Sequence, residues 1–114
     1  MKYEMRLNPV PFEMIKSGRK TIELRLFDEK RRKIRLFDRI EFTSTALPHE
    51  RIEAEVIGIY RFDSFRELYV NLPLLKFGYT EENISAAKPK DMDAYYTPEQ
   101  QEKYGVVGIE IELV

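Results

Sequence analysis

Alternation of hydrophobic and polar residues predicts five strands joined by loops and short helices. A period of two, or a run rich in Ile, Val and Phe, is typical of strands and is found in residues 2–7, 20–27, 38–43, 52–62 and 106–114. Their order along the chain has no regular strand-helix-strand rhythm. We therefore expect an α+β fold with a mostly antiparallel, barrel-like sheet and short flanking helices.

Helix signals lie between these strands. A short helix is expected after Asn8-Pro9, with Gly18 as its stop, and another after Ser64, which forms a capping-box pattern with Glu67. Residues 28–37 predict a basic loop or distorted helix, and residues 44–50 a loop. Residues 71–104 are the least regular and predict one or two short helices, the last starting at Thr97.

The strand predicted at residues 20–27 has the cleanest alternation. One face carries three aliphatic side chains, those of Ile22, Leu24 and Leu26. The other face carries three polar side chains, those of Thr21, Glu23 and Arg25. We expect the aliphatic face in the core and the polar face toward solvent. Replacing Lys20 or Glu23 by Ala should then change stability by less than about 1 kcal/mol.

Length and composition set the class of protein. A chain of 114 residues fits one core, so residues 1–114 are expected to form a single domain. The absence of Cys excludes disulfides, thiolate zinc sites and thiol nucleophiles. No apolar segment is long enough for a signal peptide or a membrane span, and a cytoplasmic location is expected.

Familiar catalytic and cofactor motifs are missing from the sequence. His49, the one histidine, follows Pro48 in a predicted loop and has no metal-binding spacing. There is no glycine-rich phosphate loop and no dinucleotide fingerprint. We therefore expect neither a metal nor a cofactor.

The charge distribution is uneven although the formal net charge is only −1. Residues 13–39 hold ten Lys or Arg and five Asp or Glu, a local charge of +5, which leaves −6 on the remainder. This segment, which includes Arg31 and Arg32, is either a phosphate-binding region or a solvated basic loop.

Residues 18–25 are the strongest candidate site. A helix stop at Gly18 brings Lys20 to the start of a strand whose polar side chains follow in steps of about 7 Å. Such a strand can hold a phosphate through Lys and Arg, or a base edge through Glu23. The alternative is a surface ion pair between Glu23 and Arg25.

The pattern Gly18-x-Lys20-x-x-Glu23-x-Arg25 resembles the signature of the ASCH (activating signal cointegrator homology) domain family, part of the PUA-like superfamily. Further similar blocks are Pro11-Phe12-Glu13, Tyr95-Tyr96-Thr97 and residues 104–109. Residues 37 and 38 are Phe-Asp, where members usually have Gly-Asp. The resemblance implies a PUA-like β-barrel with a cleft beside its helices, and binding of RNA or a modified nucleotide.

The resemblance leaves catalysis open. Some members are small amidohydrolases that act on acetylcytidine through a Lys, a Thr nucleophile and a Glu, and a nuclease activity is associated with others. Lys20 matches the Lys, but Glu23 stands where those enzymes have Thr, and Thr21 lies in the wrong slot. If the protein is a hydrolase of a modified nucleoside or of RNA, the catalytic candidates are Lys20, Thr21 and Glu23.

Tyr95 and Tyr96 could stack on bases, or could be residues at the edge of the core. The candidate ligand-binding residues are thus Arg19, Lys20, Glu23, Arg25, Arg31, Arg32, Tyr95 and Tyr96. The expected ligand is RNA, a nucleotide or a modified nucleoside.

Overall fold

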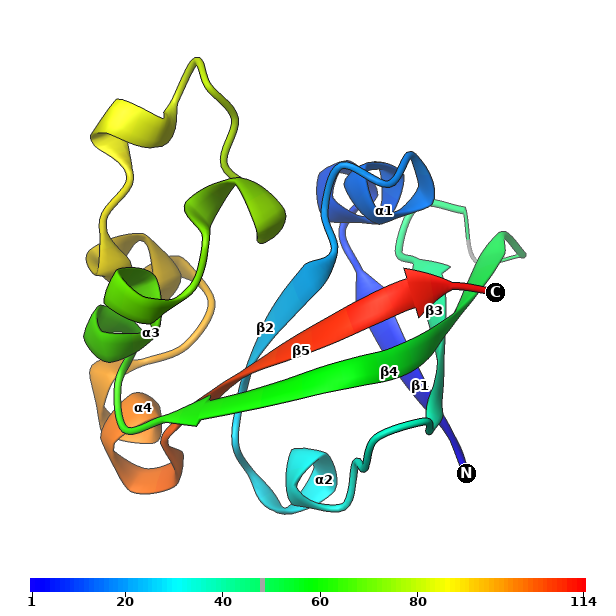
Figure 1. Cartoon of the computed structure of the whole chain (residues 1–114), viewed down its shortest axis with the longest axis horizontal. Coiled ribbons are helices and arrows are strands. Elements are labelled where there is room, and N and C mark those ends of the chain that lie inside the picture. The colour runs from blue at the N-terminus through cyan, green and yellow to red at the C-terminus, as the bar shows by residue number, and fades with distance from the viewer. Residues whose placement is uncertain (48) are drawn as a thin grey trace.

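Five strands form one mixed sheet in the computed structural model, which describes residues 1–47 and 49–114. The strands are β1 (Lys2–Leu7), β2 (Ile22–Leu26), β3 (Arg39–Ser44), β4 (Arg51–Phe62) and β5 (Val106–Leu113). Their order in the sheet is β1-β3-β4-β5-β2 (Figure 1). Only the β1–β3 pair is parallel among these, so the predicted α+β fold with a mostly antiparallel sheet is confirmed as a half-barrel.

Short helices flank the sheet. The α-helices are α1 (Pro9–Lys16), α2 (Glu29–Arg32), α3 (Phe65–Asn71) and α4 (Pro98–Tyr104). Three 3₁₀-helices lie between α3 and α4, namely η1 (Leu74–Lys76), η2 (Ile84–Ala86) and η3 (Pro89–Ala94). In Figure 1, α3, α4 and the segment between them stand together beside the β2 side of the sheet, apart from α1.

Capping side chains mark the starts of α2, α3 and α4. Ser64 Oγ accepts from the backbone N–H of Glu67, and Thr97 forms a reciprocal capping box with Gln100. The basic stretch 28–37 contains a single turn, α2, because the side chain of Asp28 accepts from the backbone N–H of Arg31. The predicted loop at 44–50 includes Pro48, which lies outside the described residues.

Two hydrophobic cores cover opposite faces of the sheet, rather than the one core expected from the chain length. The first lies between α1 and strands β1, β3, β4 and β5, with Phe42, Val56 and Ile109 at its centre. The second lies between β2 and the α3–η3 segment. The aliphatic face of β2 packs into this second core, as the alternation predicted, because residues 22, 24 and 26 are all buried there.

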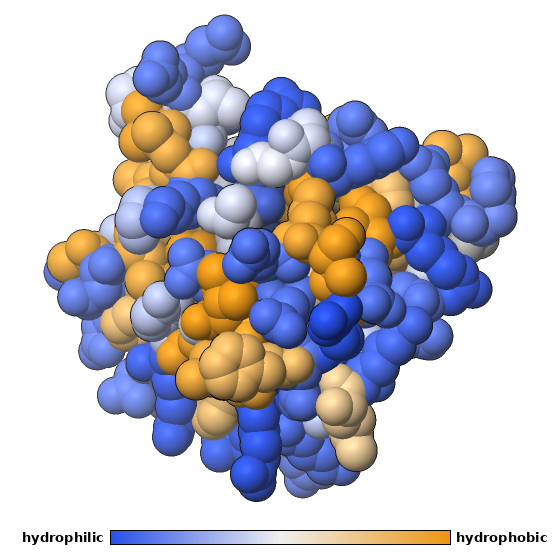
Figure 2. All heavy atoms as spheres, turned by 45° about the vertical axis from the view of Figure 1, so that its right-hand side comes forward, coloured by the Kyte–Doolittle hydropathy of each residue, from blue (hydrophilic) through white to orange (hydrophobic). Residues whose placement is uncertain are grey.

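Charged side chains dominate the surface. The face in Figure 2 is mostly hydrophilic, with hydrophobic side chains in several groups among charged ones. Phe37 is unusual, because it is 71% exposed and has a positive φ of 73°. Among the described residues, no helix is long and apolar enough to cross a membrane.

Candidate functional site

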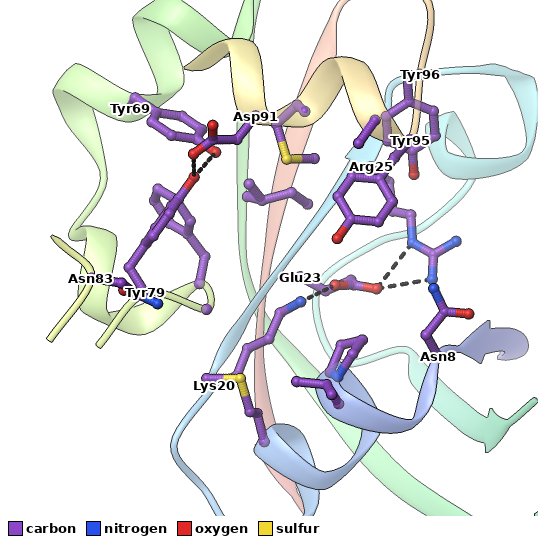
Figure 3. A pocket seen from close by; sticks show the side chains of 18 of the residues that line it. Asn8, Lys20, Glu23, Arg25, Tyr69, Tyr79, Asn83, Asp91, Tyr95 and Tyr96 are labelled. Carbon is purple, nitrogen blue, oxygen red and sulfur yellow. Dashed lines mark hydrogen bonds and ion pairs between the residues drawn. The ribbon is translucent and has the colours of Figure 1, made fainter. Parts of the chain in front are cut away.

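A cavity of about 430 Å³ opens beside β2, between α1 and the segment that runs from α3 to η3 (Figure 3). Its polar lining includes Asn8, Lys20, Glu23, Arg25, Asn83 and Asp91. Its aromatic lining consists of Tyr69, Phe77, Tyr79, Tyr95 and Tyr96. The volume falls within the roughly 300–1,000 Å³ that small-molecule sites occupy.

Lys20, Glu23 and Arg25 form a buried ion triad on this cavity. Lys20 Nζ lies 2.8 Å from Glu23 Oε1, while Arg25 Nε and Nη2 donate to Glu23 Oε2 at 3.1 and 2.9 Å. The three side chains are only 10%, 4% and 14% exposed. The expectation that this face of β2 is open to solvent is therefore wrong, because α1 and the α3–η3 segment stand on either side of it. The small stability effect expected for Lys20→Ala and Glu23→Ala depended on that open face and is withdrawn with it.

The charges of the triad are mutually stabilised. Burial opposes ionisation of Glu23, but the nearby Lys20 and Arg25 outweigh it and hold the pKa of that carboxyl below its usual value. Burial of the guanidinium lowers the pKa of Arg25, but Glu23, with a further contribution from Tyr96, more than offsets this and raises it. Glu23 is thus an anion at neutral pH, with both oxygens engaged by cations.

Backbone contacts on both sides fix the positions of the two cations. Gly18 adopts a φ of 82° after α1, and the chain returns so that the N–H of Lys20 donates to the carbonyl of Met14. Arg25 Nη2 also donates to the carbonyl of Arg6 at 3.2 Å. Because β1 and β2 are the two edges of the sheet, this bond spans the open side of the half-barrel.

Two tyrosines bring aromatic surface to the triad. Tyr96 stacks on Phe65 of the second core, with ring centroids 6.2 Å apart. Burial raises the pKa of the Tyr96 phenol, and the charges of Arg25 and Glu23 act on it from β2. Tyr95 is 65% exposed and lines the cavity from its rim. The structure thus brings both tyrosines together with Lys20, Glu23 and Arg25.

A second polar cluster was not anticipated from the sequence. The Tyr69 and Tyr79 hydroxyls lie 2.8 Å apart, and the Tyr79 hydroxyl donates to Asp91 Oδ2 at 2.7 Å (Figure 3). The bond from Tyr79, together with one from the backbone N–H of Lys88, lowers the pKa of Asp91. These hydrogen bonds connect α3 to η3 and help to form one wall of the cavity.

The other candidate residues lie outside the cavity lining. Arg19 Nε donates to Ser17 Oγ at 2.9 Å, and Thr21 uses its backbone N–H to bond Lys76. Arg31 pairs with Asp28 at 2.9 Å in the first turn of α2. Arg32 lies over the ring of Phe27, 4.6 Å from its centroid, and Arg61 lies over the same ring.

Metal ligands do not gather in the described part of the chain. No group of three or more His, Asp or Glu side chains there could hold a metal ion. His49 is exposed, in the loop where it was expected.

The chain is similar to known proteins over nearly its whole length. The family model described as the ASCH domain matches residues 5–114. A crystal structure of the hypothetical protein PH0355 is similar over 100% of both chains, with 36% identity and a TM-score of 0.82. A solution structure of protein PF0455 from Pyrococcus furiosus has 35% identity and a TM-score of 0.63, covering 100% of this chain and 98% of that one.

Structures of an ASCH protein from Zymomonas mobilis share the fold at lower identity. A mutant crystal structure of that protein has 17% identity and a TM-score of 0.66, covering 96% of this chain and 66% of the other. Among curated proteins, no match was found.

Proposed function

The chain belongs to the ASCH domain family and has its PUA-like fold, and on this premise we propose that it binds RNA or a nucleotide in the cavity beside β2. One nucleotide is received between the Lys20–Glu23–Arg25 triad and the tyrosines at positions 95 and 96. Family membership alone does not assign a ligand. The proposal therefore depends on what lines the cavity.

The proposal is supported by a cavity whose lining combines charged side chains with aromatic side chains. Proteins that recognise single-stranded RNA stack unpaired bases on Tyr or Phe and bond their polar edges and phosphates. Tyr95 and Tyr96 supply aromatic surface within the same cavity as Lys20 and Arg25. A cavity of about 430 Å³ is in the size range of small-ligand sites.

The lining favours binding over hydrolysis. A nucleophilic hydroxyl needs a neighbouring base and access to the substrate. Thr21 is not among the residues that line the cavity, and the described lining includes no Ser, Thr or Cys. Glu23 has both oxygens in ion pairs and a lowered pKa, which makes it a poor proton acceptor near neutral pH.

The test compares two tyrosines that differ in their place on the surface. Tyr95 is 65% exposed at the rim of the cavity, whereas Tyr60 is 37% exposed on β4 and lies outside the lining. Base stacking contributes about 1–3 kcal/mol per base, so Tyr95→Ala should weaken RNA binding roughly 5- to 150-fold. Tyr60→Ala is the matched control and should bind as the wild type does.

The measurement is fluorescence anisotropy with short labelled single-stranded RNAs of varied sequence. Equal affinities for Tyr95→Ala, Tyr60→Ala and the wild type would place the binding surface elsewhere. Acetylated cytidine and RNA should be incubated with the protein without added metal. Saturable binding with no product supports a binding domain. Turnover of either substrate would instead support the hydrolase function.

A further inference from the structure

We propose that the group seated on the Lys20–Glu23–Arg25 triad is a nucleotide phosphate, with the base turned toward the tyrosines. This inference rests on the proposed function and names the part of the ligand that each wall of the cavity receives. The sequence left two possibilities for these residues, a phosphate or a base edge. The geometry of the triad separates them.

Charge is the first argument. Two cations share a single carboxylate, so the triad carries a net charge of +1 although its side chains are at most 14% exposed. A buried charge is costly unless it is compensated. Counting Arg6 and Asp91, the other charged residues of the lining, leaves the cavity at +1 as well. An anionic ligand group supplies the missing compensation.

The unused hydrogen-bonding capacity is the second argument. Both oxygens of Glu23 already accept from cations, Oε1 from Lys20 and Oε2 from Arg25. Lys20 Nζ has three N–H donors, and Glu23 is its only ion-pair partner among the described residues. Arg25 has five N–H donors; Nε and Nη2 bond Glu23 and the Arg6 carbonyl, and Tyr96 also acts on the guanidinium. The triad therefore offers donors, and a ligand that fits it brings acceptor oxygens.

Asp91 does not take the place of the ligand anion. It lines the same cavity, but its Oδ2 accepts from Tyr79 and from the backbone N–H of Lys88. Glu23 and Asp91 also interact with different charges. Lys20 and Arg25 act on Glu23, whereas the charge that acts on Asp91 is that of Lys88. In Figure 3 the two carboxylates lie in different parts of the cavity.

Phosphate suits this donor set. An Arg guanidinium is a planar fork that matches phosphate oxygens, and a Lys ammonium is a point charge that accommodates varied geometry. Asn8, two residues beyond the Arg6 carbonyl that Arg25 bonds, also lines the cavity. The phosphate could belong to a free mononucleotide or to the end of an RNA, and the experiment distinguishes these sources.

The first experiment measures affinity by calorimetry at constant ionic strength. The four ribonucleosides are compared with their 5′-monophosphates, and a short RNA with a 5′-phosphate is compared with the same RNA lacking it. The best monophosphate should bind at least tenfold more tightly than its nucleoside. A preference for the free nucleotide or for the phosphorylated RNA then identifies the source. Nucleosides that bind as tightly as their monophosphates overturn the inference and leave the proposed function standing.

Variants test whether the preference comes from the triad. Lys20→Met removes the excess positive charge and should reduce the preference for the monophosphate to less than threefold. Lys103→Met removes an equal charge from α4, outside the lining, and should keep the wild-type preference. An unchanged preference in Lys20→Met would contradict the assignment.

A measurement on Glu23→Gln covers the case in which Lys20→Met does not fold. This change raises the triad to +2, so inorganic phosphate should raise the melting temperature of the variant more than that of the wild type, by linkage. Sodium chloride at equal ionic strength is the control. An equal or smaller phosphate effect in the variant overturns the inference. If phosphate protects both proteins but no nucleoside, nucleotide or RNA binds, the proposed function fails and the assignment to a nucleotide phosphate fails with it.

Discussion

Replacing Glu23 by Gln also measures how far the fold depends on the triad. The substitution keeps the size of the side chain and removes its negative charge. Lys20 and Arg25 then lose their common partner, while their side chains remain only 10% and 14% exposed. A residue on an open strand face would tolerate this change, so the result separates a buried network from a surface ion pair.

The expected magnitude follows from burial. Glu23 is 4% exposed at its side chain and accepts from Lys20 and twice from Arg25. Removing one partner of a buried pair costs about 3–5 kcal/mol, because the remaining charge is left uncompensated. An exposed pair contributes at most about 1 kcal/mol. We expect Glu23→Gln to lower the free energy of unfolding by about 3–5 kcal/mol, a large part of the roughly 5–15 kcal/mol of a typical domain.

Urea unfolding at neutral pH, followed by circular dichroism, measures this loss. Glu112→Gln is the matched control, since Glu112 is exposed on β5, and it should change the free energy of unfolding by less than about 0.5 kcal/mol. The folded-state pKa of Glu23 lies below its unfolded value, so its contribution is present above the unfolded pKa and is lost as pH falls through the folded pKa. The difference between wild type and Glu23→Gln should therefore shrink in acid.

A loss below about 1 kcal/mol would refute the reasoning, because the cations would then be reached by water. A second variant checks the electrostatic origin of the loss. Replacing all three triad residues by Met removes every charge together and should be far less destabilising than Glu23→Gln alone. The triple variant should also lose ligand binding, since the hydrogen-bond donors of Lys20 and Arg25 are gone.

Three further predictions concern other parts of the molecule. Ile22→Ala should cost about 2–5 kcal/mol of stability in urea unfolding while binding per folded molecule is retained, because Ile22 is 2% exposed in the second core; a loss below 1 kcal/mol contradicts this. Neutralising Arg31, Arg32 and Lys33 should weaken RNA binding and reduce its salt slope by roughly 0.7 per lost phosphate contact; an unchanged slope in salt titrations argues against contact with RNA. Phe37→Gly should raise the urea midpoint. Removing the positive-φ strain of a non-glycine residue gains about 1–2 kcal/mol, which exceeds the roughly 0.5–1 kcal/mol that the greater entropy loss of glycine costs on folding. A lower midpoint would show that the ring contributes packing.

Local patterns in the sequence predict the strands and helices well. Period-two alternation places β2 and its aliphatic face, and the capping residues Ser64 and Thr97 place the starts of α3 and α4. These features depend on neighbours within a few residues. They can therefore be predicted from the local sequence.

The environment of the site depends on contacts between distant residues, which the patterns do not contain. Alternation places Glu23 and Arg25 on the polar face of β2, but their burial depends on α1 and on the segment between α3 and η3. That segment is mostly turns and 3₁₀-helices, which have no periodic signature. The bond between Tyr79 and Asp91 is therefore visible only in three dimensions.

The position of β5 in the sheet bears on how the protein is made. β2 pairs with β5 alone, and most of the chain lies between Ile22 and its partner Glu110. During synthesis β2 emerges early but has no sheet partner until β5 has left the ribosome. Long-range pairings of this kind slow folding relative to helical proteins of similar size. Because β2 has no other strand partner, the sheet can hold the triad residues Glu23 and Arg25 in place only after β5 has been made.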